Sequence, residues 1–110
     1  TGIVDELPAL DASLEIVDMD DVMTRGYIRL NLKDIPGTLG KVATVIGDHG
    51  ISVRNSLQRE GFGFQVDGEQ IMPDIMTIYP AREGMIQSAL KELYGHERVY
   101  GEPYYLRIEE

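Results

Sequence analysis

Hydrophobic and polar residues alternate along several short stretches of the chain, and a period of two predicts strands. In the first stretch Ile28, Leu30 and Leu32 share one face, as expected of a strand that buries one side. Similar apolar stretches follow it, and one of them ends before Pro80. The four predicted strands cover residues 27–32, 51–57, 75–79 and 104–108.

Two other stretches have the period of an amphipathic helix, with apolar residues at i, i+3, i+4 and i+7. The apolar stripe of the first helix is Leu39, Val42, Ala43 and Ile46. The stripe of the second is Ile86, Ala89, Leu90 and Leu93. We expect the first helix to end at 47–50 and the second to begin at Glu83 and end at Gly95, because glycine tolerates the left-handed conformation of a helix end.

The predicted order is strand, helix, strand, strand, helix, strand. Short strands interleaved with two helices are typical of α+β proteins in which both helices cover one face of an antiparallel sheet. With right-handed crossovers, this order gives the ferredoxin-like βαββαβ two-layer sandwich with a four-stranded sheet. Residues 60–73 are predicted as a loop, in which Val66-Asp67-Gly68-Glu69 has the Asp-Gly pair of a type I′ hairpin turn.

Residues 1–24 differ from the remainder, because they are rich in acids and contain no basic residue. We expect a strand at 14–17 and one helical turn at 19–23. We assign 1–24 as a linker or the tail of a preceding domain, and 25–110 as a single domain. The loop glycine and terminal glutamate of a calcium-binding EF-hand are missing at the required spacing, so no metal site is predicted.

Composition and charge narrow the choice of partners. The formal net charge is -9, with 10 Lys and Arg against 19 Asp and Glu, whereas nucleic acids and anionic membranes attract clustered basic residues. Neither is therefore an expected partner. The chain has no cysteine, no apolar run of the roughly 20 residues that span a bilayer, and no signal-peptide pattern. We expect a cytoplasmic protein.

The sequence contains no recognisable catalytic motif. The two histidines, His49 and His96, each follow a helix, where the helix dipole favours a cation, and neither lies in a metal-ligand or nucleophile motif. Gly61, Gly63 and Gly68 do not form the GxGxxG turn of a dinucleotide site. We therefore expect the chain to be non-catalytic and to hold no cofactor.

The turn Asp34-Ile35-Pro36-Gly37 is the best candidate for a binding site. Pro36 fixes φ, and Gly37 lacks the Cβ that would block a ligand. The first N–H groups of the following helix lie at the positive end of its dipole and suit a carboxylate. With Asp34 holding an ammonium group, the turn would bind an amino-acid zwitterion. The alternative is that Asp34 only bonds backbone N–H groups, since Pro-Gly is ordinary turn chemistry.

A second candidate is Glu60-Gly61-Phe62-Gly63-Phe64, which resembles the core of the RNA-recognition-motif octapeptide. That module has the same order of elements, and its aromatic residues stack on bases. However, the leading basic residue is Glu60 here, and the segment precedes the third strand instead of lying on it. Together with the excess of acids, this argues against an RNA-binding module, which is kept as an alternative.

Two segments carry a family pattern: Asp34-x-Pro36-Gly37-x-Leu39-Gly40-x-Val42-Ala43 and Gly50-Ile51-Ser52-Val53. The pattern resembles the signature of ACT domains, which commonly bind amino acids. Further features resemble the C-terminal domain of the homoserine dehydrogenases; they are Gly26-Tyr27-Ile28-Arg29-Leu30, Gln58, Thr77, Glu83, Ala89-Leu90 and Leu106-Arg107-Ile108-Glu109. The resemblance covers about residues 24–110.

The resemblance implies allosteric control of a parent enzyme that reduces aspartate semialdehyde to homoserine with NAD(P) bound outside this chain. A pathway end product, typically threonine, would be the effector. ACT domains pair through their sheets, which implies a homodimer or higher homo-oligomer with the ligand at the interface. The implied ligand contacts are Asp34, Ile35, Pro36, Gly37, Thr38 and Leu39, with Ile51, Val53, Asn55 and Ser56 of a partner strand.

One departure from the family pattern concerns the ligand. The family usually has histidine after the threonine of the third strand, and this chain has Ile78 there. The alternative function is therefore an oligomerisation domain that binds no ligand.

Overall fold

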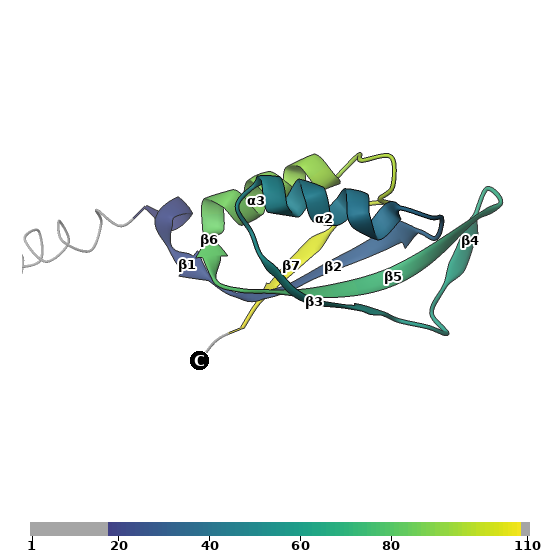
Figure 1. Cartoon of the computed structure of the whole chain (residues 1–110), viewed down its shortest axis with the longest axis horizontal. Helices are drawn as coiled ribbons and strands as arrows, with labels where there is room; N and C mark the ends of the chain where they lie inside the picture. The colour runs from purple at the N-terminus through teal and green to yellow at the C-terminus, as the bar shows by residue number, and fades with distance from the viewer. Residues whose placement is uncertain (1–17, 109–110) are drawn as a thin grey trace, which may run out of the picture.

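The computed structural model describes residues 18–108, in which two helices cover one face of a mainly antiparallel sheet (Figure 1). The sheet order is β3-β5-β2-β7, so each crossover connection places its helix on the same side. The predicted α+β, ferredoxin-like βαββαβ fold is confirmed. Its elements are β2 (Gly26–Lys33), α2 (Thr38–Asp48), β3 (Val53–Gln58), β5 (Glu69–Ile78), α3 (Glu83–Leu93) and β7 (Tyr104–Arg107).

Four short elements complete the structure: η1 (Met19–Asp21), β1 (Met23–Thr24), β4 (Phe64–Val66) and β6 (Ala81–Arg82). The helical turn expected at 19–23 is a 3-10 helix of three residues, and β1 follows it and pairs with β6. Residues 18–24 pack on the start of α3, where the Glu83 N–H donates to the Val22 carbonyl at 2.8 Å. The strand expected at 14–17 lies outside the described residues, and the domain boundary at 24 stays a prediction.

The core lies between the helices and the sheet. In β2, alternate residues are buried, as its period of two predicts. The buried apolar residues are Ile28, Leu30, Leu32, Val42, Val45, Ile46, Ile51, Met76, Ile78, Ala81, Ile86, Ala89, Leu93 and Val99. The predicted stripe of α3 therefore packs inward, with Leu90 partly buried against the core.

The predicted stripe of α2 is only half right. Val42 and Ile46 are buried, but Ala43 is exposed and Leu39 is 40% exposed. The helix packs instead through Thr38, Val42, Val45 and Ile46. This rotation leaves Leu39 beside the turn that precedes the helix.

The loop expected at 60–73 is wrong for much of its length, because β4 and the first half of β5 form a hairpin there. The type I′ turn at its tip is confirmed by positive φ at Asp67 and Gly68, 50° and 83°. β5 runs through Pro73, a residue that normally breaks a central strand. The Pro73 carbonyl accepts from Arg59 N at 2.9 Å, so its nitrogen faces the gap between β3 and β4, where no donor is needed.

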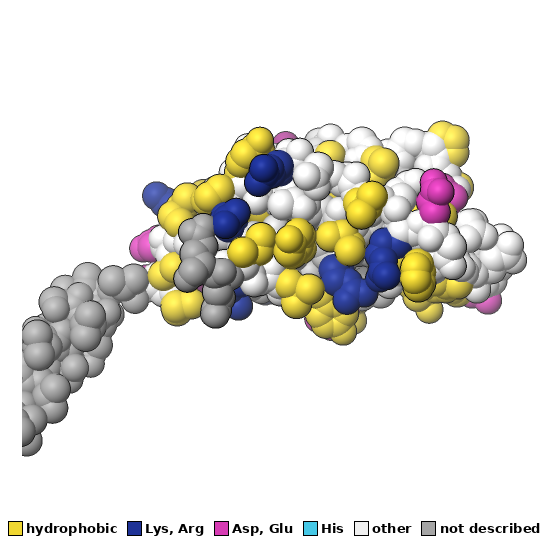
Figure 2. Space-filling model, turned by 90° about the horizontal axis from the view of Figure 1, so that it is seen from below, with side chains coloured by type: hydrophobic (Ala, Val, Ile, Leu, Met, Phe, Trp, Pro, Cys, Tyr) yellow, Lys and Arg dark blue, Asp and Glu magenta, His cyan; other side chains and the backbone are white. Residues whose placement is uncertain are grey.

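The other face of the sheet is not covered by helices, and Figure 2 views it directly. Hydrophobic side chains gather there with Lys and Arg among them. The register places Leu106 opposite Tyr27, Tyr104 opposite Arg29, and Leu57 opposite Ile75 on this face. Leu57, Tyr104 and Leu106 are 63%, 62% and 50% exposed. We call this surface the open sheet face.

Candidate functional site

The predicted binding turn lies at the mouth of a cavity of about 160 Å³ beneath the start of α2. We call it the turn cavity. Leu32, Gln58 and Met72 of the sheet form its floor, and the end of β2, the turn and the first residues of α2 form its rim. The rim residues are Lys33, Asp34, Ile35, Gly37, Thr38, Leu39 and Gly40. Five of the six predicted contacts from the turn therefore border one cavity.

The sixth, Pro36, does not line the cavity but helps to fix the turn. Arg98 Nη1 donates to the Pro36 carbonyl at 3.0 Å and to Thr38 Oγ1 at 2.9 Å. Gly37 adopts φ of 87°, a left-handed conformation that favours glycine. A Cβ at Gly37 would lie 3.8 Å from Arg98 Nη1, so the backbone conformation, not space, requires glycine here.

Arg98 also adds positive charge at the start of α2. Its guanidinium bonds the side chain of Thr38, the first residue of the helix. The first N–H groups of a helix have no carbonyl four residues earlier to accept their hydrogen bonds. Thr38 N bonds Ile35 O at 3.3 Å, and Lys41 N makes the first regular helical bond, to Gly37 O. A carboxylate here would meet both a helix N-terminus and a fixed cation.

Asp34 is exposed, and its backbone N–H donates to the Gln70 carbonyl at 2.9 Å. Within residues 18–108, its carboxylate has no hydrogen bond or ion pair. The alternative, in which the Asp34 carboxylate accepts hydrogen bonds from the backbone N–H groups of the turn, is therefore not observed. Asp34 remains available to a ligand.

The four contacts assigned to a partner strand lie along or just before β3. Ile51 is 3% exposed and belongs to the core, and Val53 packs partly against it. Asn55 and Ser56 are exposed on the edge strand. None of the four borders the turn cavity of its own chain, to which β3 contributes only Gln58.

Asp74 is the most unusual polar residue of the sheet. It is 1% exposed, and Ser56 Oγ donates to its Oδ1 at 2.7 Å. Among buried side-chain atoms of the described chain, Asp74 Oδ2 alone has no hydrogen-bond partner. Burial raises the pKa of Asp74 above its ordinary value of 3.8, although the bond from Ser56 acts in the opposite direction.

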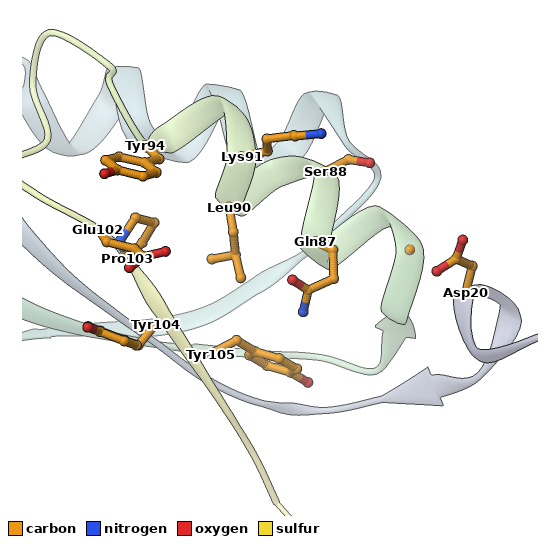
Figure 3. A pocket seen from close by; sticks show the side chains of 11 residues that line it. Asp20, Gln87, Ser88, Leu90, Lys91, Tyr94, Glu102, Pro103, Tyr104 and Tyr105 are labelled. Carbon is orange, nitrogen blue, oxygen red and sulfur yellow. The ribbon is translucent and has the colours of Figure 1, made fainter.

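A larger cavity, of about 630 Å³, lies between α3 and β7 (Figure 3). Leu90 and Gln87 point from α3 toward the strand that carries Tyr104 and Tyr105. Tyr94 and Tyr104 at its border are 60% and 62% exposed, so it is an open groove. The first turn of α3 borders it through Gly84, but Asp20 lies against that turn and would repel a carboxylate. We therefore regard the smaller turn cavity, where Arg98 bonds the first residue of the helix, as the better amino-acid site.

A carboxylate cluster joins both ends of the described chain at the start of α3. Glu83, 3% exposed, accepts from Arg107 Nε at 2.7 Å, Gln87 Nε2 at 2.8 Å and Thr24 Oγ1 at 3.1 Å. Thr24 Oγ1 also lies 2.9 Å from Tyr105 Oη. Burial alone would raise the pKa of Glu83, but these hydrogen bonds and the Arg107 charge outweigh it and lower the pKa.

The remaining sequence candidates form no site of their own. His49 Nε2 lies 2.7 Å from Glu92 Oε1, and His96 Nδ1 accepts from Arg98 N at 3.0 Å. Phe64 lies on the short strand β4, opposite Ile71 of β5, and packs edge-on against Tyr100, with 5.8 Å between the ring centroids. Residues 18–108 contain no group of three metal-ligating side chains. No helix in that range is long and apolar enough to cross a membrane.

Sequence reasoning missed Arg98 and Asp74. Arg98 is more than sixty positions from Pro36 in a loop, and no local pattern signals their contact. Asp74 interrupts the apolar run of a strand, which is the one signal that could have drawn attention to it. Arg98 contacts the turn that the sequence identified, and Asp74 lies opposite Gln58 of the cavity floor.

The chain is similar to proteins of known family. Residues 26–66 match the family model of the ACT domain. The chain is 30% identical over 94% of its length to a homoserine dehydrogenase of Synechocystis sp., and 32% identical over 76% to one of Pseudomonas aeruginosa. A homoserine dehydrogenase structure from Thiobacillus denitrificans superposes with a TM-score of 0.69, at 23% identity over 86% of this chain and 19% of that one.

In its fold and in its turn, the chain agrees with the ACT domain model that residues 26–66 match. Its homologues are homoserine dehydrogenases. The chain spans 24% and 18% of the two curated relatives, so it corresponds to a minor part of each.

Proposed function

We propose that this chain is the regulatory ACT domain of a homoserine dehydrogenase and that it binds an amino acid, threonine first among the effectors to test, at the turn cavity. The observation that carries the proposal is that three features lie at or beside one small cavity. The N-terminus of α2 and the unpaired carboxylate of Asp34 border it, and the guanidinium of Arg98 bonds Thr38 on its rim.

The features match the two ends of a zwitterion. The ligand carboxylate lies against the first N–H groups of α2, where Arg98 adds a full positive charge to the helix dipole. Asp34 takes the ammonium group. Leu39, which the rotation of α2 leaves 40% exposed, covers the ligand side chain.

Allosteric control requires that the ligand favours one arrangement of the protein over another. In this proposal the arrangement is that of two or more copies, because Asn55 and Ser56 are exposed on an edge strand, where a ligand bound by a neighbour could meet them. Edge strands readily pair with a second chain. Self-association through the domain therefore completes the site.

The open sheet face supports the second candidate function, oligomerisation without a ligand. Its exposed Leu57, Tyr104 and Leu106 form an apolar surface of the kind that marks protein interfaces. Leu57→Lys would shift the oligomer to smaller species in sedimentation, whereas Tyr94→Lys, on the helix side, would not. An unchanged size for both variants would remove this candidate.

Hydride transfer belongs, in this proposal, to the part of the protein outside the chain. Gly63 and Gly68 lie in the β4–β5 region and not at the turn between a strand and a helix, where a dinucleotide phosphate binds. The chain would supply the control and not the chemistry. Its cellular site would be the cytoplasm, where the proposed parent enzyme works.

Thermal melting with and without amino acids tests the proposal. A ligand at 100 times its Kd stabilises the folded state by about 2.7 kcal/mol, which for a domain of this size raises Tm by roughly 10 °C or more. We expect threonine to produce this shift and D-threonine not to. No shift with any of the twenty L-amino acids would leave oligomerisation as the function.

A further inference from the structure

Asp74 does not border the turn cavity, but its neighbours in the sheet do. Gln58, which faces Asp74 across the β3–β5 pair, forms part of the cavity floor. Met72, two residues earlier on the same side of β5, forms another part. Asp74 therefore lies in the same row of the sheet as Gln58 and two residues beyond Met72, so it adjoins two floor residues.

Burying a carboxyl with an unused acceptor is costly unless something else completes it. Ser56 already serves Oδ1, so a donor is missing only at Oδ2. Gln58, which lines the cavity opposite Asp74, is exposed on an edge strand. Its long side chain can turn outward and open the way to Oδ2.

We propose that Asp74 determines ligand specificity, by accepting a hydrogen bond from the side-chain hydroxyl of a small amino acid bound in the turn cavity. This inference rests on the proposed function and adds to it the class of side chain that the site selects. The cavity, about 160 Å³, suits a short side chain. A hydroxyl supplies the missing donor without bringing another charge into the core.

The expected selectivity follows from the state of Asp74 before binding. Its Oδ2 is unpaired in the free protein, so an apolar ligand gains nothing there and loses nothing further. A hydroxyl gains one bond to a buried carboxylate, which corresponds to about 10- to 100-fold in Kd. Threonine should therefore bind 10- to 100-fold more tightly than valine, which has nearly the same shape.

The test is calorimetric titration of the intact chain with L-threonine and L-valine, for the wild type, Asp74→Leu and Asp74→Asn. Leucine keeps the branched shape and removes both acceptors, so we expect equal affinities for the two ligands. Asparagine keeps the acceptor for Ser56 and loses the charge. A neutral bond is about half as strong, so the ratio of affinities should fall to a few-fold. Asp74→Asn carries the test if the leucine variant does not fold.

Asp34→Asn is the matched control, because Asp34 is assigned to the ammonium group that both ligands carry. It should weaken both by the same factor and preserve their ratio. The ¹³C resonance of the Asp74 carboxyl should shift with threonine but not with valine. Equal affinities in the wild type, or a ratio unchanged in both Asp74 variants, would overturn the role of Asp74 and leave the proposed function standing. Binding of no amino acid would overturn both.

Discussion

Replacing Glu83 by glutamine tests whether the buried carboxylate cluster stabilises the domain. Glutamine has the same shape as Glu83, but it is neutral and carries an amide donor. The new amide nitrogen must face either Arg107 Nε or Gln87 Nε2, and both of these atoms are donors. The substitution therefore weakens one charged hydrogen bond and sets two donors against each other.

The magnitude follows from these contacts. A hydrogen bond to a charged group contributes about 1.5–3 kcal/mol and a neutral one about 0.5–1.5 kcal/mol. Losing the charge and one acceptor therefore costs about 2–3 kcal/mol. Arg107 is 48% exposed, so water recovers part of its loss and favours the lower figure. At about 2 kcal/mol, Tm should fall by roughly 8–16 °C.

Denaturant and thermal unfolding at several pH values provide the assay. Because the pKa of Glu83 is lowered below its ordinary value of 4.5 in the folded state, its contribution is present above that value and is lost as the pH falls through the lowered pKa. The deficit of Glu83→Gln should therefore be full at pH 7 and shrink on acidification below about pH 4.5.

The exposed ion pair between Lys41 and Glu97, at 3.3 Å, is the matched control. Lys41→Gln should change the free energy of unfolding far less than Glu83→Gln does, because both side chains are at least half exposed. Similar small effects for Glu83→Gln and Lys41→Gln would refute the argument that burial makes the Glu83 cluster stabilising.

Three further substitutions address the site. Gly37→Asp should abolish the thermal shift with threonine and leave the oligomer size unchanged. The φ of 87° disfavours a side chain, and a carboxylate there repels the carboxylate of the ligand. A thermal shift that persists in this variant would mean that the turn has only a structural role. Arg98→Leu should cost about 1–2 kcal/mol in denaturant unfolding and weaken threonine binding about tenfold, because two hydrogen bonds to the turn are lost; binding unchanged by calorimetry would contradict this. Asp74→Leu should stabilise the chain more at pH 7 than at pH 3. The pKa of Asp74 is raised in the folded state, so the stability of the wild type falls as the pH rises from the ordinary pKa of 3.8 through the raised pKa. A gain in stability that does not depend on pH in unfolding experiments would be inconsistent with a buried ionised carboxyl.

The sequence was sufficient for the order of elements and for the position of the turn. Periodicity identifies β2 because its alternate residues face two different environments. Periodicity misplaced part of the buried face of α2. Thr38 and Leu39 are adjacent in the sequence, and only the packing of the helix decides which of the two is buried. It shortened β5 because a proline is usually incompatible with a central strand, and the gap that accommodates Pro73 is a property of the partner strands.

The binding site was predictable only where it is local. The turn carries its own signal in Pro36 and Gly37, whose conformational preferences act within a few residues. Arg98 reaches the same turn from a distant loop, and Asp74 acquires its character only when Ser56 and the helix layer bury it. Contacts of this kind depend on the completed fold, which a single sequence does not display.

The Glu83 cluster also bears on how such a domain can be reused in evolution. Thr24 and Arg107 bond the same carboxyl, and the Ile108 N–H donates to the Arg25 carbonyl at 2.9 Å. The polypeptide therefore enters and leaves the sandwich at one point. A unit with this geometry can be added to a host protein, or inserted within one of its loops, without a spacer to bring the two junctions together. The Glu83 cluster makes such a transfer possible, because the contacts that hold the entering and leaving segments together lie within the domain itself.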